Sequence, residues 1–420
     1  MDTNHFAWSL RIRNLSTTRY EKNIPETTNG LQPGGGTVRA RDTEQRLMTR
    51  GIERVCVIGA GISGLVCALA MAGRGIRVEV LGASTRPCAS PVHLEIAPSM
   101  LRDLVHLGVG EDCVRTGFAY QGMDVVDGRG RRLFELPTER LAGQRYPAAL
   151  GICHRDLRQI LECAAMARGV IVKRGARVTA VQPHGVHMRA ELESGEAVEA
   201  DIALLAAGAG SDLRAALFPR SCPPDDVGQA WWYALVPRPV DLDRPLIGIG
   251  QAGRRAILVP VRHDTAGLAL IEARRASNPD SAIPHLRTVL ASFAPRLRAV
   301  ADRLTADTPV ALRPARSGLL ASPWHRGGVL AVGDCAHALP PHFGQATAQA
   351  VEDARVLGEL LARTSDRAVL FEAFERRRLE RVRHVHRLTA TAARWDVEPD
   401  SEADLSLLMN QLTQTVAHPS

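Results

Sequence analysis

A glycine-rich turn follows the first strongly apolar run of the chain. Its residues are Gly59-Ala60-Gly61-Ile62-Ser63-Gly64, a GxGxxG spacing between an expected strand at 55–58 and an expected helix at 62–74. Glycine at these three positions permits a tight turn, a close approach of the backbone to a pyrophosphate, and close packing of helix on strand. The helix N-terminus attracts phosphate charge. The pattern therefore predicts a dinucleotide phosphate site.

The fingerprint also predicts an acidic residue about 20 positions further on, whose carboxylate binds ribose hydroxyls. The second expected strand, 77–81, is followed instead by Gly82. Arg86 is the only nearby arginine that could take a 2′-phosphate role. Hydrogen bonds to a charged acceptor contribute about 1.5–3 kcal/mol each, so Gly82 puts the anchoring of an adenosine ribose in question.

A second candidate segment runs Gly333-Asp334-Cys335-Ala336-His337-Ala338-Leu339-Pro340-Pro341-His342-Phe343-Gly344-Gln345-Ala346. A buried strand that ends in Gly-Asp can present a carboxylate to sugar-like hydroxyls. The paired prolines fix a rigid wall. Gly344 and Gln345 open a helix whose free N–H groups can face an electron-rich ring edge. This segment carries the strongest chemical signal in the chain.

The second segment resembles the GD-A-A-H-x-x-x-P motif of flavoprotein monooxygenases, the single-component FAD-dependent aromatic hydroxylases related to salicylate hydroxylase, 4-hydroxybenzoate hydroxylase and alkylquinolone hydroxylase. The likeness extends from residue 54 to about residue 390. Residues 152–157 resemble the family's R-x-L helix start, and residues 232–237 its W-R-G-L-V-P strand, with Tyr233 in place of arginine. Residues 323–327 resemble its lead-in to the Gly-Asp strand. The resemblance thus covers most of the chain.

The resemblance implies an FAD-dependent monooxygenase that uses NAD(P)H and O2 to hydroxylate an electron-rich aromatic or related small organic substrate. In this family the oxygen is transferred by a flavin C4a-hydroperoxide, and the protein supplies position and dryness. NAD(P)H would visit transiently, because no second GxGxxG follows a strand to hold it.

The resemblance and the glycine fingerprint together name the cofactor-binding candidates. They are Gly59, Ala60, Gly61, Ser63, Gly64, Arg155, Asp334, Pro341, Gly344 and Gln345. Arg155 would contact the flavin cofactor and Asp334 its ribityl chain. Pro341, Gly344 and Gln345 would lie along the isoalloxazine ring.

Two further positions depart from the family pattern, and two histidines invite a catalytic role. Ala207 stands where the G-A-D-G motif has an aspartate associated with pyrophosphate and NAD(P)H contacts, and Ala346 stands where G-Q-G has its second glycine. His337 follows Asp334 closely and is interpreted as a hydrogen-bonded structural residue. His342 remains a candidate general base. No side chain is assigned as an essential catalyst.

Two other functions stay open at this point. A flavin halogenase has a related fold but carries a lysine in its second glycine segment and a W-x-W-x-I-P stretch, and neither occurs here. A pseudoenzyme or ligand-binding protein could keep the fold while Gly82, Ala207 and Ala346 relax the site. A purified protein that is yellow with FAD would favour the enzyme over the binder.

The elements that must position these motifs follow from hydrophobic patterning. Apolar runs at 55–58, 202–205 and 329–332 precede glycine, as buried strands of a parallel sheet do. Residues 123–136 are hairpin-like, and residues 170–200 alternate like antiparallel strands. We therefore expect an open parallel sheet with antiparallel additions.

The chain of 420 residues exceeds one hydrophobic core, because single cores stop growing at about 250–300 residues. The expected fold class is α/β (α+β), with a Rossmann-like FAD-binding domain, a second, mostly antiparallel β-sheet substrate domain, and C-terminal helices. The expected division is a disordered tail at 1–50, a first FAD-binding part at 51–215 with a β insert at about 121–150, a substrate-domain sheet at 216–319 with one helix at 284–299, a second FAD-binding part with C-terminal helices at 320–395, and a polar tail at 396–420.

The formal net charge of +7 and a pI near 9.2 raise the question of a nucleic-acid partner. The densest basic run is Arg376-Arg377-Arg378, followed by Arg381 and Arg383 and interspersed with Glu375 and Glu380. This mixture is interpreted as a solvated helix face. Nucleic acid is therefore not an expected partner.

Eight cysteines lack any C-x-x-C pair or zinc-site spacing, which favours reduced thiols and no metal site. No run of 18 apolar residues could span a bilayer, and the N-terminus has no signal-peptide pattern. The true start could be Met48, just ahead of the first strand. We expect a cytoplasmic monomer or homodimer whose partners are a small aromatic-type substrate and O2.

Overall fold

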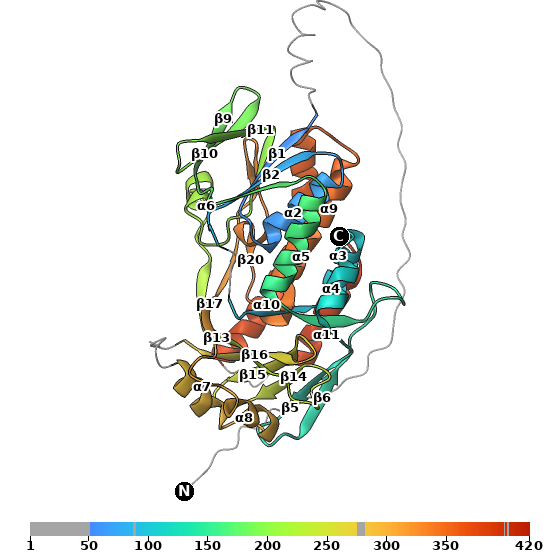
Figure 1. Cartoon of the computed structure of the whole chain (residues 1–420), viewed down its shortest axis with the longest axis vertical. Coiled ribbons are helices and arrows are strands. Elements are labelled where there is room, and N and C mark those ends of the chain that lie inside the picture. Colours follow the sequence, from blue (N-terminus) through green and yellow to red (C-terminus); the bar gives the residue numbers. More distant parts are fainter. Residues whose placement is uncertain (1–50, 87–89, 275–281, 399, 401–402) are drawn as a thin grey trace, which may run out of the picture.

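The structure is a computed structural model that describes residues 51–420 apart from 87–89, 275–281, 399 and 401–402. The expected disordered tail at 1–50 lies outside the described residues. Two large sheets lie end to end along the long axis of the molecule, with helices packed around them (Figure 1). The expected α/β class, with a Rossmann-like domain, a mostly antiparallel second sheet and C-terminal helices, is confirmed.

The first sheet has six strands in the order β18-β19-β12-β1-β2-β8. They are β1 (Arg54–Ile58), β2 (Arg77–Gly82), β8 (Ile171–Arg174), β12 (Ile202–Leu205), β18 (His325–Arg326) and β19 (Val329–Ala331). All neighbours are parallel except β18 and β19. The buried runs are therefore central strands, as predicted. Residues 171–174, expected among antiparallel strands, instead pair in parallel with β2, because a crossover helix precedes them.

Helices and two small sheets complete this domain. The helices are α2 (Ile62–Ala72), α3 (Pro98–His106), α4 (Gly110–Thr116), α5 (His154–Ala167), α6 (Asp212–Leu217) and α9 (Gln345–Leu361). The small sheets are β11-β10-β9, from β9 (Val178–His184), β10 (His187–Leu192) and β11 (Ala197–Ala200), and β3-β7-β4, from β3 (His93–Ile96), β4 (Phe118–Tyr120) and β7 (Ala149–Cys153). One continuous apolar core joins α2 and α9 to the six-stranded sheet and to β9–β11.

The second sheet has eight strands in the order β20-β17-β13-β16-β15-β14-β5-β6. They are β5 (Met123–Val126), β6 (Arg132–Leu136), β13 (Asp225–Pro237), β14 (Leu246–Ile249), β15 (Arg255–Pro260), β16 (Thr265–Ala273), β17 (Val310–Leu319) and β20 (His337–Ala338). Neighbours are antiparallel except β14 and β5. The hairpin at 123–136 forms as predicted and extends this second sheet through β14.

Two helical predictions need correction. The single helix expected at 284–299 is two helices, α7 (Ala282–Leu290) and α8 (Pro295–Ala301), because Pro295 fits the first turn of a new helix better than the interior of an old one. Residues 396–420, expected as a polar tail, contain helix α11 (Leu405–Ala417). It buries Leu408, Leu412 and Val416, whose spacing of four places them on one face.

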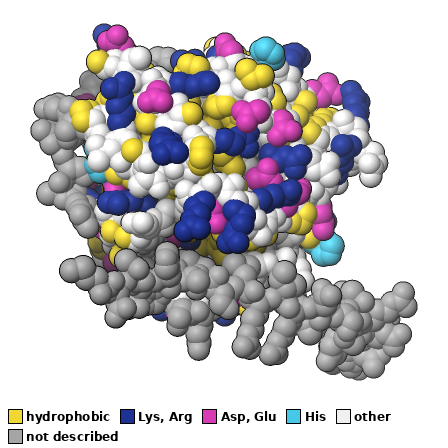
Figure 2. Space-filling model, turned by 90° about the horizontal axis from the view of Figure 1, so that it is seen from below, with side chains coloured by type: hydrophobic (Ala, Val, Ile, Leu, Met, Phe, Trp, Pro, Cys, Tyr) yellow, Lys and Arg dark blue, Asp and Glu magenta, His cyan; other side chains and the backbone are white. Residues whose placement is uncertain are grey.

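No helix among the described residues combines the length and the hydropathy needed to cross a bilayer. Figure 2 shows the molecule from below Figure 1, and on that face Lys and Arg side chains are interspersed with Asp and Glu. A face of mixed sign offers no continuous basic surface to a phosphate backbone.

The basic run on helix α10 (Arg367–Val397) is only partly solvated, which corrects the prediction. Arg378 is fully buried; its Nε donates to Asp353 Oδ1 at 2.8 Å and its Nη1 lies 2.7 Å from Glu352 Oε2. Burial raises the pKa of each carboxyl, but the guanidinium of Arg378 and neighbouring donors outweigh burial and hold both pKa values at about 2. The sequence pattern conceals this because Arg378 shares its helix with exposed arginines such as Arg383.

Replacing Arg378 with methionine is predicted to destabilise the fold by about 3–5 kcal/mol, because two buried carboxylates lose their cation. Urea unfolding of Arg378→Met and of wild type measures the difference. Arg383→Met is the matched control: Arg383 is exposed and, among the described residues, pairs only with Glu380, and such pairs contribute about 0–1 kcal/mol. Equal losses in the two variants would contradict the assignment.

Candidate functional site

The glycine turn is shaped by what surrounds each missing side chain. A Cβ on Gly59, which has φ +120°, would lie 2.3 Å from the Ala206 carbonyl oxygen, and one on Gly64 would lie 1.9 Å from the Gly59 oxygen. These two glycines are therefore required for packing. A Cβ on Gly61 would meet nothing within 4 Å, and Gly61 is exposed. Backbone open to solvent at this position is what a pyrophosphate needs.

The N-terminus of α2 reinforces that opening. Its first turn has no acidic residue and its N-cap Gly61 offers no side-chain cap, so the helix N–H groups remain free to meet an anion. Ser63 lies in this turn, partly exposed. The turn can therefore hold a phosphate without displacing a protein group.

Gly82 has a packing reason as well as a functional consequence. A Cβ on Gly82 would lie 2.8 Å from the Cβ of Ala60, closer than real Cβ contacts. The end of β2 and the glycine turn are thus in direct contact. A carboxylate at position 82 could fit only if this turn moved.

Arg158 is the arginine of α5 that touches the glycine turn, and the flavin contact of Arg155 stays a prediction. Arg155 is exposed on α5, with Nε 3.5 Å from Asp156 Oδ1. Arg158 is buried, donates from Nε to the Ala60 carbonyl at 3.1 Å, and pairs with Glu162 at 3.2 Å. In the sequence, the burial of Arg158 is indicated only by its position on the same helix face as Leu161, one turn away.

Asp334 lies beside the glycine turn although 270 residues separate them in sequence. It sits in the short 3₁₀ segment η2 (Gly333–Cys335), where Gly333 has φ +56° and a Cβ would lie 2.4 Å from Ser63 Oγ. This close approach brings both segments to one edge of the six-stranded sheet. Asp334 is exposed, yet the protein around it dehydrates the carboxyl and raises its pKa, with His337 opposing.

Asp353 holds the Gly-Asp turn in place. Its Oδ2 accepts a hydrogen bond from the Gly333 N–H at 3.0 Å and lies 2.7 Å from His337 Nε2. His337 is fully buried, as expected of a structural residue. Arg378 completes the arrangement on the other carboxylate oxygen.

The proline wall and the start of α9 form the second half of the site. Segment η3 (His342–Gly344) links them, and both Phe343 and Gly344 have positive φ, at 60° and 65°. Gly344 is needed there because a Cβ would lie 3.1 Å from the Glu95 carbonyl oxygen. The N–H groups of Gly344 and Gln345 donate to the Pro341 and His342 carbonyls. The rest of the first turn of α9 carries no acidic residue and no side-chain cap, and Pro341 is partly exposed beside it.

Gln345 faces inward instead. It is almost completely buried, donates to the Phe343 carbonyl at 3.2 Å and accepts from Gln349 Nε2 at 3.2 Å. Its backbone N–H donates to the His342 carbonyl, so Gln345 closes the turn that leads into α9. Ala346 packs against the apolar cluster formed with α11, which accounts for a methyl where the family pattern has glycine.

His342 belongs to a buried network. Its Nε2 lies 2.9 Å from Asp396 Oδ2, and Gln229 and Arg255 also contact this carboxylate. Burial lowers the pKa of His342 although Asp396 opposes it. The ring meets Trp231 edge-on at 5.2 Å. His342 thereby ties the proline wall to α10 and to the second sheet.

The second sheet turns one face toward this site. Along β13, Trp232 packs under α7 and α8, whereas Trp231 and Tyr233 point the other way and stack at 6.0 Å. Small apolar side chains form the floor beside them: Ala269, Ala311 and Ala315. This face of the sheet is therefore an apolar, aromatic layer that reaches the proline wall where Trp231 meets His342.

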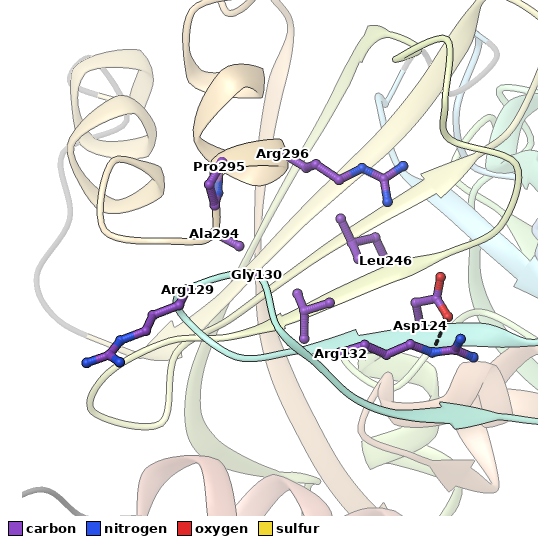
Figure 3. A pocket seen from close by; sticks show the side chains of 9 residues that line it. Asp124, Arg129, Gly130, Arg132, Leu246, Ala294, Pro295 and Arg296 are labelled. Carbon is purple, nitrogen blue, oxygen red and sulfur yellow. Dashed lines mark ion pairs between the residues drawn. The ribbon is translucent and has the colours of Figure 1, made fainter.

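A separate pocket of about 290 Å³ lies between the β5–β6 hairpin, β14 and the start of α8 (Figure 3). It is lined by Asp124, Val126, Arg129, Gly130, Arg132, Leu246, Ala294, Pro295 and Arg296. Arg132 is paired with Asp124 and Arg296 with Asp241. None of the predicted site residues reaches it.

Comparison with known proteins agrees with this geometry. The family described as "FAD binding domain" matches residues 53–389. The chain is 26% identical over 347 residues to a putative FAD-dependent monooxygenase, YetM, of Bacillus subtilis, covering 82% of this chain and 94% of the relative. It is 25% identical over 362 residues to 6-hydroxynicotinate 3-monooxygenase of Bordetella bronchiseptica, covering 81% and 91%.

Solved structures share the fold. Klebsiella pneumoniae HpxO, crystallised with FAD and uric acid, superposes with a TM-score of 0.78 at 23% identity, covering 89% of this chain and 99% of that one. The matched residues include both glycine segments and the sheet that faces them. The chain therefore belongs to the FAD-binding family of single-component FAD-dependent aromatic hydroxylases and is an oxidoreductase of the flavoprotein monooxygenase type.

Proposed function

We propose that this protein uses NAD(P)H and O2 to hydroxylate an electron-rich aromatic or related small organic substrate. The carrying observation is the contact of Gly333 with Ser63, which puts the carboxylate of Asp334 beside the open glycine turn. Relatives whose names state a substrate act on ring compounds, 6-hydroxynicotinate and urate. These two relatives support a small ring compound as the substrate of this chain.

The residues present fit FAD, so each can be given a role. The open backbone at Gly61 and the N-terminus of α2 would hold the pyrophosphate, and Asp334 would accept hydrogen bonds from the ribityl hydroxyls. The positive end of the α9 dipole, with the N–H groups of its first turn beyond Gln345, would stabilise negative charge on the ring edge. Bound FAD supplies hydride acceptance from NAD(P)H and the activation of O2.

The second sheet would exclude water from the substrate site and orient the substrate ring. Trp231 and Tyr233 have flat apolar rings beside His342 and His93, against which a substrate ring would pack. Exclusion of water strengthens every polar contact made there. NAD(P)H would act as a transient co-substrate. The described cysteines are free thiols, which supports a reducing, cytoplasmic setting. The protein would act there as a monomer or homodimer.

The alternative of a ligand-binding protein or pseudoenzyme keeps one observation in its favour. Gly82 and Ala60 pack so closely that no ribose-binding carboxylate fits at the end of β2, and Ala207 adds no charge to its exposed loop. Without carboxylates at positions 82 and 207, FAD affinity and the reduction of FAD by the coenzyme would be weaker. Retention of FAD and the rate of NAD(P)H oxidation separate the two functions.

The FAD-loaded protein is predicted to oxidise NADH or NADPH in air, faster when a ring substrate is added, and to place one atom of isotopically labelled O2 in the product. Stopped-flow absorbance and mass spectrometry measure the two effects, with an anaerobic reaction as control. A protein that keeps FAD but oxidises neither coenzyme, whatever aromatic compound is added, would be the binder.

Substitutions of Gly61 are predicted to weaken FAD without unfolding the protein. A Cβ there would meet nothing within 4 Å and φ is −80°, so the free energy of unfolding of FAD-free Gly61→Ala should change by less than about 0.5 kcal/mol. FAD affinity should fall from wild type to Gly61→Ala to Gly61→Val, by at least about tenfold, or about 1.4 kcal/mol, for valine. Calorimetric titration with FAD tests the order; unchanged affinity in Gly61→Val would place the pyrophosphate elsewhere.

A further inference from the structure

Glu95 lies on β3, at the junction of the two sheets. Leu94 and Ile96 pack into the core of the FAD-binding domain. The alternate residue His93 faces the second sheet, with its ring 5.7 Å from that of Tyr233. Side chains of a strand alternate between faces, so Glu95 projects on the same side as His93, toward the aromatic surface of β13.

Glu95 also borders the turn that opens α9. Its backbone oxygen lies 3.1 Å, and its Cβ 3.9 Å, from the position that a Cβ on Gly344 would take. Across the small sheet it pairs with Gly151, whose missing side chain admits the Pro260 carbonyl oxygen to 2.2 Å of the Cβ position. The residue is therefore held between the flavin-facing turn and the second sheet.

The carboxyl of Glu95 makes no hydrogen bond or ion pair with any described residue, although its side chain is only partly exposed. Tyr120 on β4 and Tyr233 on β13 stand close enough for the charge of Glu95 to raise their pKa values, beyond the larger effect of burial. Tyr120 Oη is itself buried without a partner. Buried polar groups are normally satisfied, so Tyr120 Oη and the partly exposed Glu95 carboxyl beside it together mark a place where a ligand group can bind.

No cation among the described residues offsets the charge of Glu95. Burial raises the pKa of this carboxyl to about 7. Of the groups around it, burial lowers the pKa of His93 to about 4 and also lowers that of His342, so both favour the neutral form. Arg313 on β17 acts on Tyr233, lowering its pKa against burial, and donates to Ser90 Oγ. Glu95 thus changes charge near neutral pH.

We propose that Glu95 recognises the substrate by accepting a hydrogen bond from a ring O–H or N–H, and then accepts that proton. This inference rests on the proposed hydroxylation. The O–H or N–H bond breaks, the proton passes to a carboxylate oxygen of Glu95, and the bonding electron pair stays on the substrate, where it makes the ring more nucleophilic. The substrate class is phenols and N–H heteroaromatics, and aromatic carboxylates are disfavoured at this end of the site by charge repulsion.

The test uses the FAD-loaded protein in its oxidised state, with phenol and benzoate as probes and the flavin absorbance as the signal. Ligand binding in this state needs neither NAD(P)H nor turnover, so its outcome is separate from that of the proposed hydroxylation. Glu95→Gln keeps the shape and removes the charge. Glu111→Gln, an exposed glutamate on α4, is the matched control.

Phenol stays protonated near pH 7, since phenolic groups titrate at about pH 10. Its affinity for wild type and for Glu111→Gln should therefore rise as pH increases through 7, when Glu95 loses its proton. Glu95→Gln should bind phenol at least about tenfold more weakly above pH 7 and show no such rise. Glu95→Asp, which keeps a carboxylate, should retain a rise with pH, and unfolding midpoints verify that each variant is folded.

For benzoate, the charge of Glu95 should have the opposite effect on affinity. Benzoate should bind wild type more weakly than phenol does above pH 7 and should gain affinity in Glu95→Gln. Equal phenol affinity and an equal pH profile in wild type and Glu95→Gln would overturn the proposal. So would any result in which phenol binds wild type no better than benzoate does.

Discussion

The carboxylate of Asp353 is the interaction on which both halves of the site depend. One oxygen binds the Gly333 N–H and His337, and the other binds Arg378 of α10. A single buried side chain therefore fixes the Gly-Asp turn to α9 and α9 to α10. Because Arg378 also pairs with Glu352, and Glu352 with the buried Arg355, the network brings two carboxylates and two guanidinium groups out of water together. A buried ion network of this kind is stable only when every charge keeps its partner. Loss of one member is therefore expected to disrupt the geometry of the Gly-Asp turn.

Close backbone contacts carry this order across the first sheet. Gly333 touches Ser63, Gly59 touches Ala206, and Gly82 touches Ala60 at distances that exclude a side chain. The GxGxxG turn is thus the centre of three neighbouring strand ends, and not a free loop. The absence of an acid at position 82 fits this tight packing. Arg158, bonded to the Ala60 carbonyl, adds a positive charge on the same turn.

The sequence predicts the parallel strands and the two glycine segments well, because apolar runs before glycine report buried strands directly. It predicts the environment of single charges poorly. Arg378 and Arg383 look alike in a basic helix, and only the partner elements decide that one is buried. Likewise, seven of the 13 residues of α11 are apolar, and only the elements that carry Leu339 and Leu388 decide which three of them are buried. Arg155 and Arg158 differ by three residues, and the turn that one of them contacts is 98 positions away.

Asp353 and Glu95 show how the same carboxyl group acquires opposite pKa shifts in different surroundings. Asp353 is surrounded by Arg378, His337 and a backbone N–H, so its pKa falls to about 2 against the effect of burial, and it stays charged at every physiological pH. Glu95 is dehydrated without compensation, so its pKa rises to about 7. A carboxylate whose partners are complete has no capacity left for chemistry, whereas one left without partners beside the turn that opens α9 retains both a charge to share and a proton to exchange. The contrast lies in the neighbours, since both side chains sit on well-packed elements of the same domain.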